Sequence, residues 1–250
     1  MDIATTTIIA LLVCIVAALY SSVGHGGASG YLAVLSLFAY TPREMSSTAL
    51  VLNVLVSTIG FIAFARAKHF RFALAWPFLL LSVPGAFLGG LVHVSEEAYY
   101  MLLAAVLLVA AYRLSRNGSF VQNVTVTKKV SLEIALPVGA GIGFLSGVVG
   151  VGGGIFLSPL MILLGWAGPK QTAAVAAFFI LVNSIAGIGG RLVQHTFDVR
   201  SMVPFLVAAF LGGLLGSYFG ANKFTGMILR RVLAVVLLLA AGKLVLLVIR

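Results

Sequence analysis

Two glycine-rich clusters interrupt an otherwise apolar chain, and their composition suits the binding of an anion. The first reads GHGGASG at residues 24–30 and the second reads GVGGG at residues 150–154. Glycine lets the backbone turn and lets a ligand come close to the amide groups. The first N–H groups of a following helix have no partner within it and carry partial positive charge. The candidate anion-binding residues of the clusters are Gly26, Gly27, Ser29, Gly153 and Gly154.

Close helix packing is the alternative role for glycine in a membrane chain, because small residues let two backbones approach each other. Two further glycine groups, GAFLGG at 85–90 and GGLLGS at 212–217, lie inside long apolar segments, and for these we expect packing. For the clusters at 24–30 and 150–154 we expect a ligand site. Each of them directly precedes an apolar segment too short to cross a membrane.

Four polar side chains lie near the middle of two long apolar segments. Asn53 and Asn183 are the two amides, Ser57 follows Asn53 by four positions, and Ser184 is the counterpart of Ser57 in the second half. Polar groups at bilayer depth need partners and usually face the protein interior. We expect all four to line the anion site; hydrogen bonding between helices is the alternative.

Cationic side chains near segment ends could attract an anion to each mouth of the site. Arg43 and Lys170 open the two long segments that hold the amides, and Arg191 lies on one helical face with Asn183. Extension of the charged head to the membrane interface is the alternative for Arg43 and Lys170. His25 could carry a coupled proton, since the ordinary pKa of histidine is about 6.5; a hydrogen-bonded structural histidine is the alternative.

The composition places these residues in an all-α polytopic membrane protein. The chain has 250 residues, of which 61% are hydrophobic and 9% charged, and its mean hydropathy is +1.16, whereas soluble domains carry about 25% charged residues. The net charge of +10 is therefore interpreted as membrane topology, not nucleic-acid binding. A single cysteine, Cys14, excludes an intramolecular disulfide and a multi-cysteine metal site. Nothing in the sequence suggests a cofactor.

The chain is an internal duplication. A shift of 127 residues brings Pro42-Arg43 onto Pro169-Lys170 and Gly26-Gly27 onto Gly153-Gly154, and it holds over about 65 residues. We therefore expect one transmembrane repeat at 1–115, a linker at 116–129 and a second repeat at 130–250.

Each repeat contains five apolar segments, so the two repeats enter the membrane in opposite senses and form an inverted repeat. The segments cover about 3–22, 29–40, 44–65, 72–93 and 98–114, and then about 131–149, 154–166, 171–193, 200–221 and 226–249. The second segment of each repeat gives a helix of roughly 18–20 Å, against a hydrocarbon core of about 30 Å. These two are expected to be broken or re-entrant.

Basic residues set the orientation, because Lys and Arg accumulate in cytoplasmic loops. With the linker placed in the cytoplasm, eleven basic residues lie inside and four outside. Both termini are then outside, and the protein is expected in a bacterial inner membrane.

The chain resembles the TauE/SafE sulfite exporter family, also called the toluene sulfonate uptake permease family. The resemblance rests on SSVGHGGASGYL, on GVVGVGGGIFLSPLM, on the Pro-Arg and Pro-Lys steps and on the duplicated layout. It implies a secondary transporter, somewhat more in keeping with export, of a small anion such as sulfite or an organosulfonate. The first repeat departs from the second at His25, where the shift of 127 places a glycine.

Two other functions remain open at this point. An anion channel would share the fold and the site but lack alternating access. An intramembrane serine protease of the rhomboid type would use Ser29 in GASG, with His93 or His195 as base. The duplication argues against the protease, because residues 154–157 read GIFL and carry no serine. We expect no enzymatic activity, and a small anion, the bilayer and coupled protons as the partners.

Overall fold

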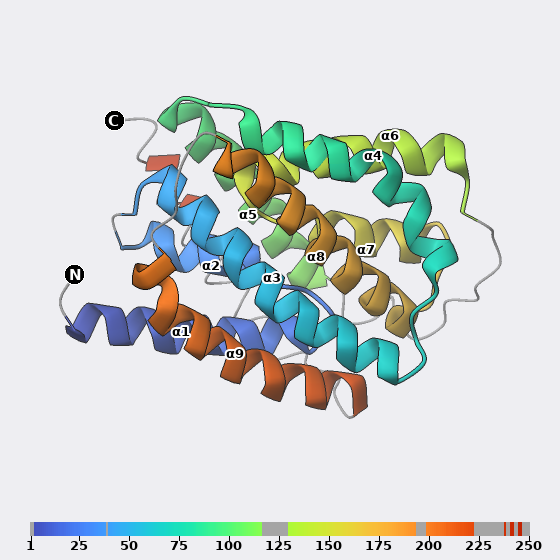
Figure 1. Cartoon of the computed structure of the whole chain (residues 1–250), viewed down its shortest axis with the longest axis horizontal. Helices are drawn as coiled ribbons and strands as arrows, with labels where there is room; N and C mark the ends of the chain where they lie inside the picture. The colour runs from blue at the N-terminus through green and yellow to red at the C-terminus, as the bar shows by residue number, and fades with distance from the viewer. Residues whose placement is uncertain are drawn as a thin grey trace.

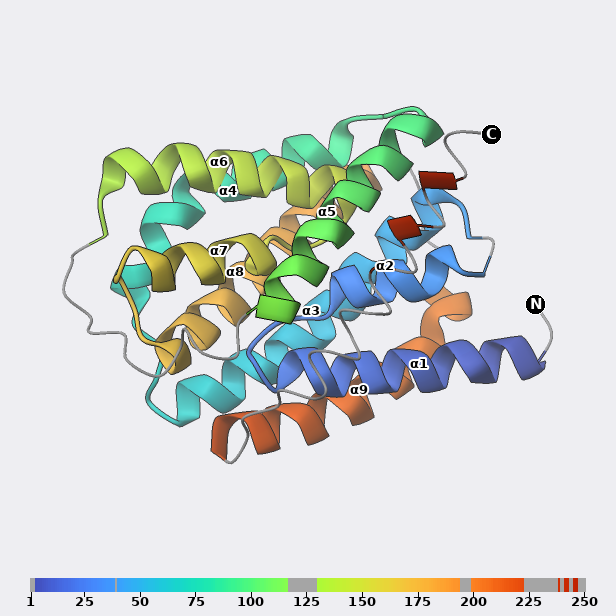
Figure 2. The ribbon, with the colours of Figure 1, turned by 180° about the vertical axis from the view of Figure 1, so that it is seen from behind.

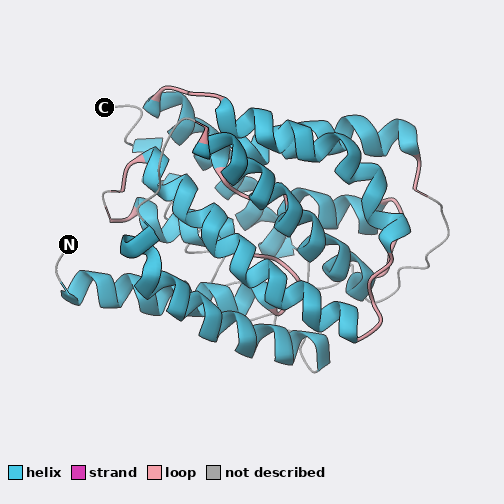
Figure 3. Ribbon diagram, in the orientation of Figure 1, coloured by secondary structure: helices cyan, strands magenta, loops and turns pink. Residues whose placement is uncertain are grey.

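The computed structural model describes residues 3–38, 40–116, 130–193 and 199–222, with five more residues of the last segment, and their regular structure is helical (Figure 3). In chain order the helices are α1 (Ile3–Ser21), α2 (Ala28–Ser36), α3 (Pro42–Arg66), α4 (Phe72–Leu91), α5 (Glu96–Arg116), α6 (Leu132–Val149), α7 (Gly154–Leu163), α8 (Pro169–Leu192) and α9 (Val199–Asn222). The expected linker and most of the expected tenth segment lie outside the described residues.

Six of these helices are long and apolar enough to cross a membrane, namely α1, α3, α4, α6, α8 and α9. The polytopic all-α class is therefore confirmed. The short second segments are confirmed as well: α2 has 9 residues and α7 has 10, which is roughly 14–15 Å at 1.5 Å per residue. Each begins within its glycine cluster, α2 at Ala28 and α7 at Gly154.

The long helices α3 and α8 begin where the sequence carries a start signal. Pro42 and Pro169 occupy their first positions, where a missing N–H costs nothing and the fixed φ suits a helix. Thr41 caps α3, since its backbone N–H donates to Glu44 Oε2 at 2.9 Å and its Oγ1 accepts from the Glu44 N–H at 3.3 Å. These signals fix the ends of the two helices that carry the buried amides.

Helices α4 and α6 pack together on one side of α3 and α8, and α1 and α9 pack on the other (Figures 1 and 2). Glycine makes both contacts possible. A Cβ on a glycine of α6 or α9 would overlap a carbonyl of α4, of α1 or of the residue that follows α1. The pairs advance by four on both sides: Gly139 with Phe78, Gly143 with Ser82, Gly147 with Ala86, Gly212 with Cys14, Gly216 with Ala18 and Gly220 with Ser22.

The glycine groups at 85–90 and 212–217 take part in these contacts, so their expected packing role is confirmed. Each contact joins one helix from each half, and both pairs run parallel. If a two-fold axis exchanged the two halves, the pair formed by α1 and α9 would be superposed on the pair formed by α6 and α4. In Figure 2, α1 and α6 run in opposite directions. This arrangement is what an inverted repeat requires; the inverted relation itself stays a prediction of the sequence.

The ends of α3 and α8 agree with the loop assignment made from charge. His69 follows α3, and its pKa is lowered by burial and, to a smaller extent, by the nearby charge of Lys170 at the start of α8. The C-terminal end of α3 and the N-terminal end of α8 therefore lie at the same end of the molecule. The charge count had placed both inside.

Candidate functional site

The two glycine clusters share two left-handed glycines at matching places, and the second cluster has one more, Gly152, with φ of +76°. Gly24 and Gly27 have φ of +74° and +99°, and Gly150 and Gly153 have φ of +86° and +80°. In each cluster the second of these glycines is the residue immediately before the short helix. This left-handed region favours glycine, so the cluster composition has a backbone cause. We call residues 24–27 the first break and residues 150–153 the second break.

The matching turns correct the register predicted at the clusters. Gly24 corresponds to Gly150 and Gly27 to Gly153, a shift of 126 residues, whereas Pro42 and Pro169 at the starts of α3 and α8 are 127 apart. The extra residue is accommodated within α7, which is one residue longer than α2.

The pairing of Gly26-Gly27 with Gly153-Gly154 was therefore wrong by one position. His25 corresponds to Val151, and not to a glycine as the shift of 127 had placed it. Gly26 corresponds to Gly152, a glycine that the sequence reasoning left out of the site.

Asn53 of α3 lies between the two breaks. A Cβ on Gly26 would overlap Asn53 Oδ1, and a Cβ on Gly152 would lie 2.6 Å from Asn53 Nδ2. The amide nitrogen donates to the carbonyl of Val151 at 3.3 Å, and the residue is fully buried. One predicted amide thus contacts backbone from both halves.

Ile180 of α8 faces the same two glycines. Its Cγ2 would lie 3.0 Å from a Cβ on Gly26 and 2.8 Å from a Cβ on Gly152, and its Cδ1 would overlap a Cβ on Gly154. The shift of 127 makes Ile180 the counterpart of Asn53. The centre of the site is therefore a related pair, one polar and one apolar, held between two related turns.

The other predicted polar residues separate into two groups. Ser184 Oγ lies 3.2 Å from the position of a Cβ on Gly152 and has no hydrogen-bond partner within the described part of the chain. Ser57 donates to the carbonyl of Asn53 in its own helix, and Asn183 Nδ2 donates to the carbonyl of Phe179 at 2.8 Å, also in its own helix. The structure brings Asn53 and Ser184 to the breaks, whereas Ser57 and the Asn183 nitrogen have intrahelical partners. The Oδ1 atoms of both Asn53 and Asn183 have no hydrogen-bond partner among the described residues.

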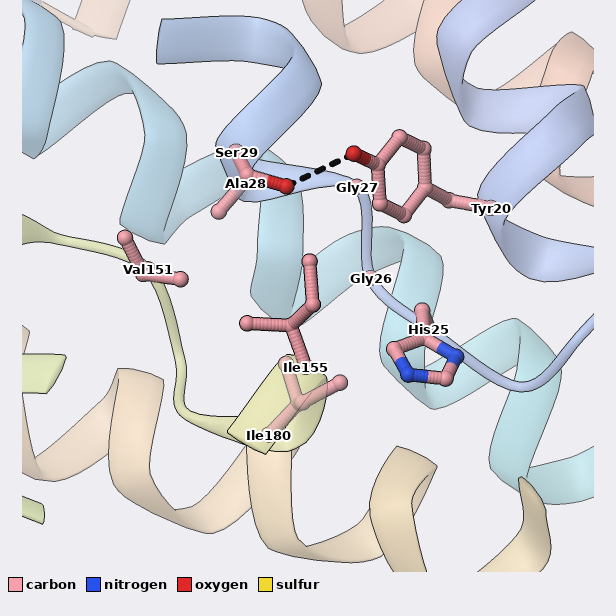
Figure 4. A pocket seen from close by; sticks show the side chains of 9 residues that line it. All are labelled: Tyr20, His25, Gly26, Gly27, Ala28, Ser29, Val151, Ile155 and Ile180. Atoms are coloured by element: carbon pink, nitrogen blue, oxygen red, sulfur yellow. Dashed lines mark hydrogen bonds between the residues drawn. The ribbon is translucent and has the colours of Figure 1, made fainter. Parts of the chain in front are cut away.

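A small pocket opens beside the first break (Figure 4). Its volume is about 10 Å³, which is about the space that one ordered water needs. The lining residues are Tyr20, His25, Gly26, Gly27, Ala28, Ser29, Val151, Ile155 and Ile180. Sequence reasoning missed the other five lining residues, although Ile180 could have been found by applying the shift of 127 to Asn53.

Three polar side chains of the pocket already have partners. Tyr20 Oη and Ser29 Oγ share a hydrogen bond of 2.7 Å (Figure 4). His25 Nδ1 lies 3.0 Å from the carbonyl oxygen of Val23, and it must carry the proton there because a carbonyl only accepts. In Figure 4 the imidazole lies at the opposite end of the break from Ser29.

The predicted cations occupy different environments. Arg43 and Lys170 are exposed at the helix starts. Arg191 Nη2 donates to the carbonyls of Gly147 and Val148, each at 2.8 Å. These are carbonyls of the last turn of α6, which lack helical donors, so Arg191 stabilises the helix end that leads into the second break. Sequence reasoning missed this role.

The protease alternative requires a histidine at Ser29, and the structure pairs Ser29 with Tyr20 instead. His93 follows α4, and His195 lies outside the described residues. Within the described part of the chain, no group of three or more His, Cys, Asp or Glu side chains is placed to hold a metal ion.

Comparison with known proteins decides the family. The model of the family described as Sulfite exporter TauE/SafE matches residues 9–244. The chain belongs to the sulfite exporter TauE/SafE family. The resemblance read from the glycine clusters is thereby confirmed, and the protein is a multi-pass membrane protein of a transporter family.

Two relatives cover most of the chain. The probable membrane transporter protein y4hK of Sinorhizobium fredii is 34% identical over 94% of this chain and 96% of its own length. The probable membrane transporter protein YunE of Bacillus subtilis is 22% identical over 82% of this chain and 81% of its own.

A third relative, the sulfite exporter TauE/SafE family protein 2 of Arabidopsis thaliana, is 35% identical over 30% of this chain and 16% of its own length. No solved structure matches the chain.

Proposed function

We propose that this TauE/SafE family member is a secondary transporter of a small sulfur-containing anion, and that the anion binds where the two breaks meet. The observation that carries the proposal is the convergence of Gly26 and Gly152 on Asn53 and Ile180. Two helix N-termini from different halves of the chain thus approach one point.

Backbone amides supply the attraction in this proposal. The first N–H groups of α2 and α7 lack helical acceptors and carry the positive end of the helix dipole. The nearby hydroxyls of Ser29 and Ser184 can add donors. Such a site does not depend on a buried Lys or Arg, which is costly at bilayer depth. The site therefore binds an anion by many partial charges.

Alternating access is the mechanism that we propose, and the unequal contribution of the two breaks to the pocket supports it. The pocket is lined mainly by the first break, while Ile180 covers the start of α7. A cavity of about 10 Å³ is too small for an oxyanion with several oxygen atoms. The two halves must move apart to admit one, and an inverted repeat provides two opposite ways to do so.

Direction and placement complete the proposal. The family description favours export of sulfite or a related organosulfonate. The charge count favours a bacterial inner membrane with both termini outside and the 116–129 linker in the cytoplasm. A cysteine placed in that linker in a Cys14→Ala background should resist an impermeant thiol reagent in intact cells; labelling would reverse the orientation.

The proposal is tested on purified protein. Ligands that bind only the folded state raise its melting temperature by mass action. Sulfite or an organosulfonate should raise the melting temperature at concentrations where chloride does not. Reconstituted protein should show saturable counterflow of the same anion. Absence of stabilisation by every sulfur oxyanion would reject the site, and flux without counterflow would favour the channel.

A further inference from the structure

Asn53 has a buried oxygen that nothing in the described structure satisfies. The residue has no exposed surface, and its Oδ1 has no hydrogen-bond partner among the described residues. The orientation of the amide is fixed, because Nδ2 faces the carbonyl of Val151 at 3.3 Å and two oxygens cannot share that contact. Oδ1 is therefore the atom that lies against Gly26, and Gly26 in turn lines the pocket.

An oxygen that can only accept is unexpected in a site for an anion. The helix N-termini and Ser184 Oγ offer donors, which suit oxygens of negative charge. A fully deprotonated oxyanion has no hydrogen to give Asn53 Oδ1 and would place its own lone pairs against it. A buried acceptor left without a donor weakens binding.

We propose that the transported anion carries its own hydrogen-bond donor and that Asn53 Oδ1 accepts it. This inference rests on the proposed anion site. The negative oxygens face the amides of the breaks and the Ser184 hydroxyl, and the donor faces Asn53. The ligand class is an anionic head with an adjacent O–H or N–H group.

The difference between Asn53 and its counterpart Ile180 fixes how the ligand is oriented in the site. The counterpart of Asn53 is Ile180, which offers neither donor nor acceptor and lies against the same two glycines. A ligand with one donor can therefore satisfy Asn53 in only one orientation. Its apolar or fully deprotonated side then faces Ile180.

Two kinds of anion share this chemistry. One is a singly protonated oxyanion, such as hydrogen sulfite, whose O–H is lost as the pH rises. The other is a sulfonate with a hydroxyl or amino group near the head, whose sulfonate stays ionised throughout the ordinary pH range. The shared feature is the donor, and the two sources differ in how their binding changes with pH.

The first experiment compares ligands on the wild-type protein by calorimetric titration. Ethanesulfonate, 2-hydroxyethanesulfonate and 2-aminoethanesulfonate carry the same head and differ in the donor. Sulfite is titrated in parallel across neutral pH, with methanesulfonate as a reference that does not change its own charge. The reference also reports any contribution of His25 and Tyr20, the titratable side chains that line the pocket.

Donor-bearing ligands should bind about tenfold more tightly than ethanesulfonate, which corresponds to about 1.4 kcal/mol. A sulfonate cargo would show this preference at every pH. A protonated oxyanion cargo would instead show sulfite affinity falling with rising pH while that of methanesulfonate holds. Equal binding of donor-bearing and donor-free ligands, with no such loss for sulfite, overturns the inference and leaves the anion site intact.

The second experiment uses a variant that the duplication itself suggests. Asn53→Ile introduces the residue found at the related position, and it should abolish the preference while some anion affinity remains. Ser82→Ala is the matched control. Ser82 Oγ is also buried without a partner among the described residues, but it lies in the contact of α4 with α6. The shift of 127 pairs Ser82 with Ala209, so this variant also introduces the residue found at the related position. The control should keep both affinity and preference. A preference that survives in Asn53→Ile overturns the inference, whereas failure of every anion to bind wild-type protein rejects the proposed function itself.

Discussion

The two breaks share a backbone and differ in their side chains. Both turn through left-handed glycines at equivalent positions and both end at the start of a short helix. The first break is surrounded by Tyr20, His25 and Ser29. At the second break, a Cβ on Gly153 would lie 2.6 Å from Ile142 and 2.8 Å from Phe179. The first break itself contributes polar side chains, whereas Gly153 in the second break is surrounded by apolar ones and Gly152 meets Asn53 and Ser184 from the long helices.

This difference distinguishes the backbone features that both repeats retain from the side chains that differ between them. Both halves keep the positive φ at the first and last glycine of the break and the close contacts with Asn53 and Ile180, and these features set where the helix N-termini point. The side chains that decide which groups of a ligand are satisfied have diverged. An anion would therefore use both backbones and would meet different side chains at each break: Tyr20, His25 and Ser29 at the first, and Ser184 at the second.

Substitution of the glycine before each short helix gives the largest expected effect. Gly27→Val and Gly153→Val should each lower anion affinity by about 100-fold or more, because a β-branched residue at positive φ is strained and its side chain would meet Tyr31 or Phe179. Equal losses would show that both backbones contribute. Titration calorimetry measures the effect, and Gly141→Ala, whose added Cβ meets nothing within 4 Å, is the control. Loss at Gly27 alone would restrict the site to the first break.

A second substitution removes the polarity difference at the centre. Ile180→Asn should tighten anion binding by about tenfold, because a new amide could donate to the ligand from the side of the second break. The melting temperature without ligand should fall, since the new polar group is buried among apolar neighbours. Weaker binding with an unchanged cavity would mean that the anion does not reach Ile180.

The sequence predicted the breaks, the short helices and the packing glycines because each follows from local composition. The register slip was also readable: a shift of 126 superposes Gly24, Gly26 and Gly27 on Gly150, Gly152 and Gly153. One constant shift for the whole repeat does not detect it. A single residue added to α7 changes which residues of the two repeats correspond on its N-terminal side, and leaves the correspondence of α3 with α8 unchanged.

The roles of the two buried amides could not be separated in this way. Asn53 and Asn183 occupy similar depths in similar segments. The partner of Asn53 is a carbonyl 98 positions away, and the partner of Asn183 is one turn back in its own helix. Hydrogen-bond partners depend on how helices rotate against each other, and sequence spacing does not record that rotation.

Loss of one buried hydroxyl at each break should give a moderate effect. Tyr20→Phe removes the partner of Ser29 Oγ beside the pocket, and anion affinity should fall about three- to tenfold. Tyr99→Phe removes a comparable hydroxyl that donates to the carbonyl of Val149 at 3.1 Å. It should lower the melting temperature more than the affinity. The opposite ranking would place the ligand at the second break.

Replacement of His25 tests whether the polar break also carries a proton. Protonated imidazole would add positive charge beside the anion, so transport should slow as the pH rises through the histidine pKa. Two variants should remove this pH dependence: His25→Gln, and His25→Val, which introduces the residue found at the related position 151. Both should change the maximal transport rate only a few-fold. Flux into liposomes at several pH values measures it. A pH profile unchanged from wild type would leave His25 with its structural bond to Val23.

Substitution of the exposed cations should have the smallest effect on anion binding, and it extends the comparison to the two entrances of the site. Arg43 and Lys170 occupy equivalent positions at the starts of α3 and α8. Arg43→Gln and Lys170→Gln should each slow anion association about twofold at low salt, because exposed charges act by long-range attraction. The effect should disappear near physiological ionic strength, where the screening length is about 8 Å. Rapid-mixing measurements of association at several salt concentrations test this. An effect that persists at high salt would mean that either side chain touches the bound anion, and the backbone would then not act alone.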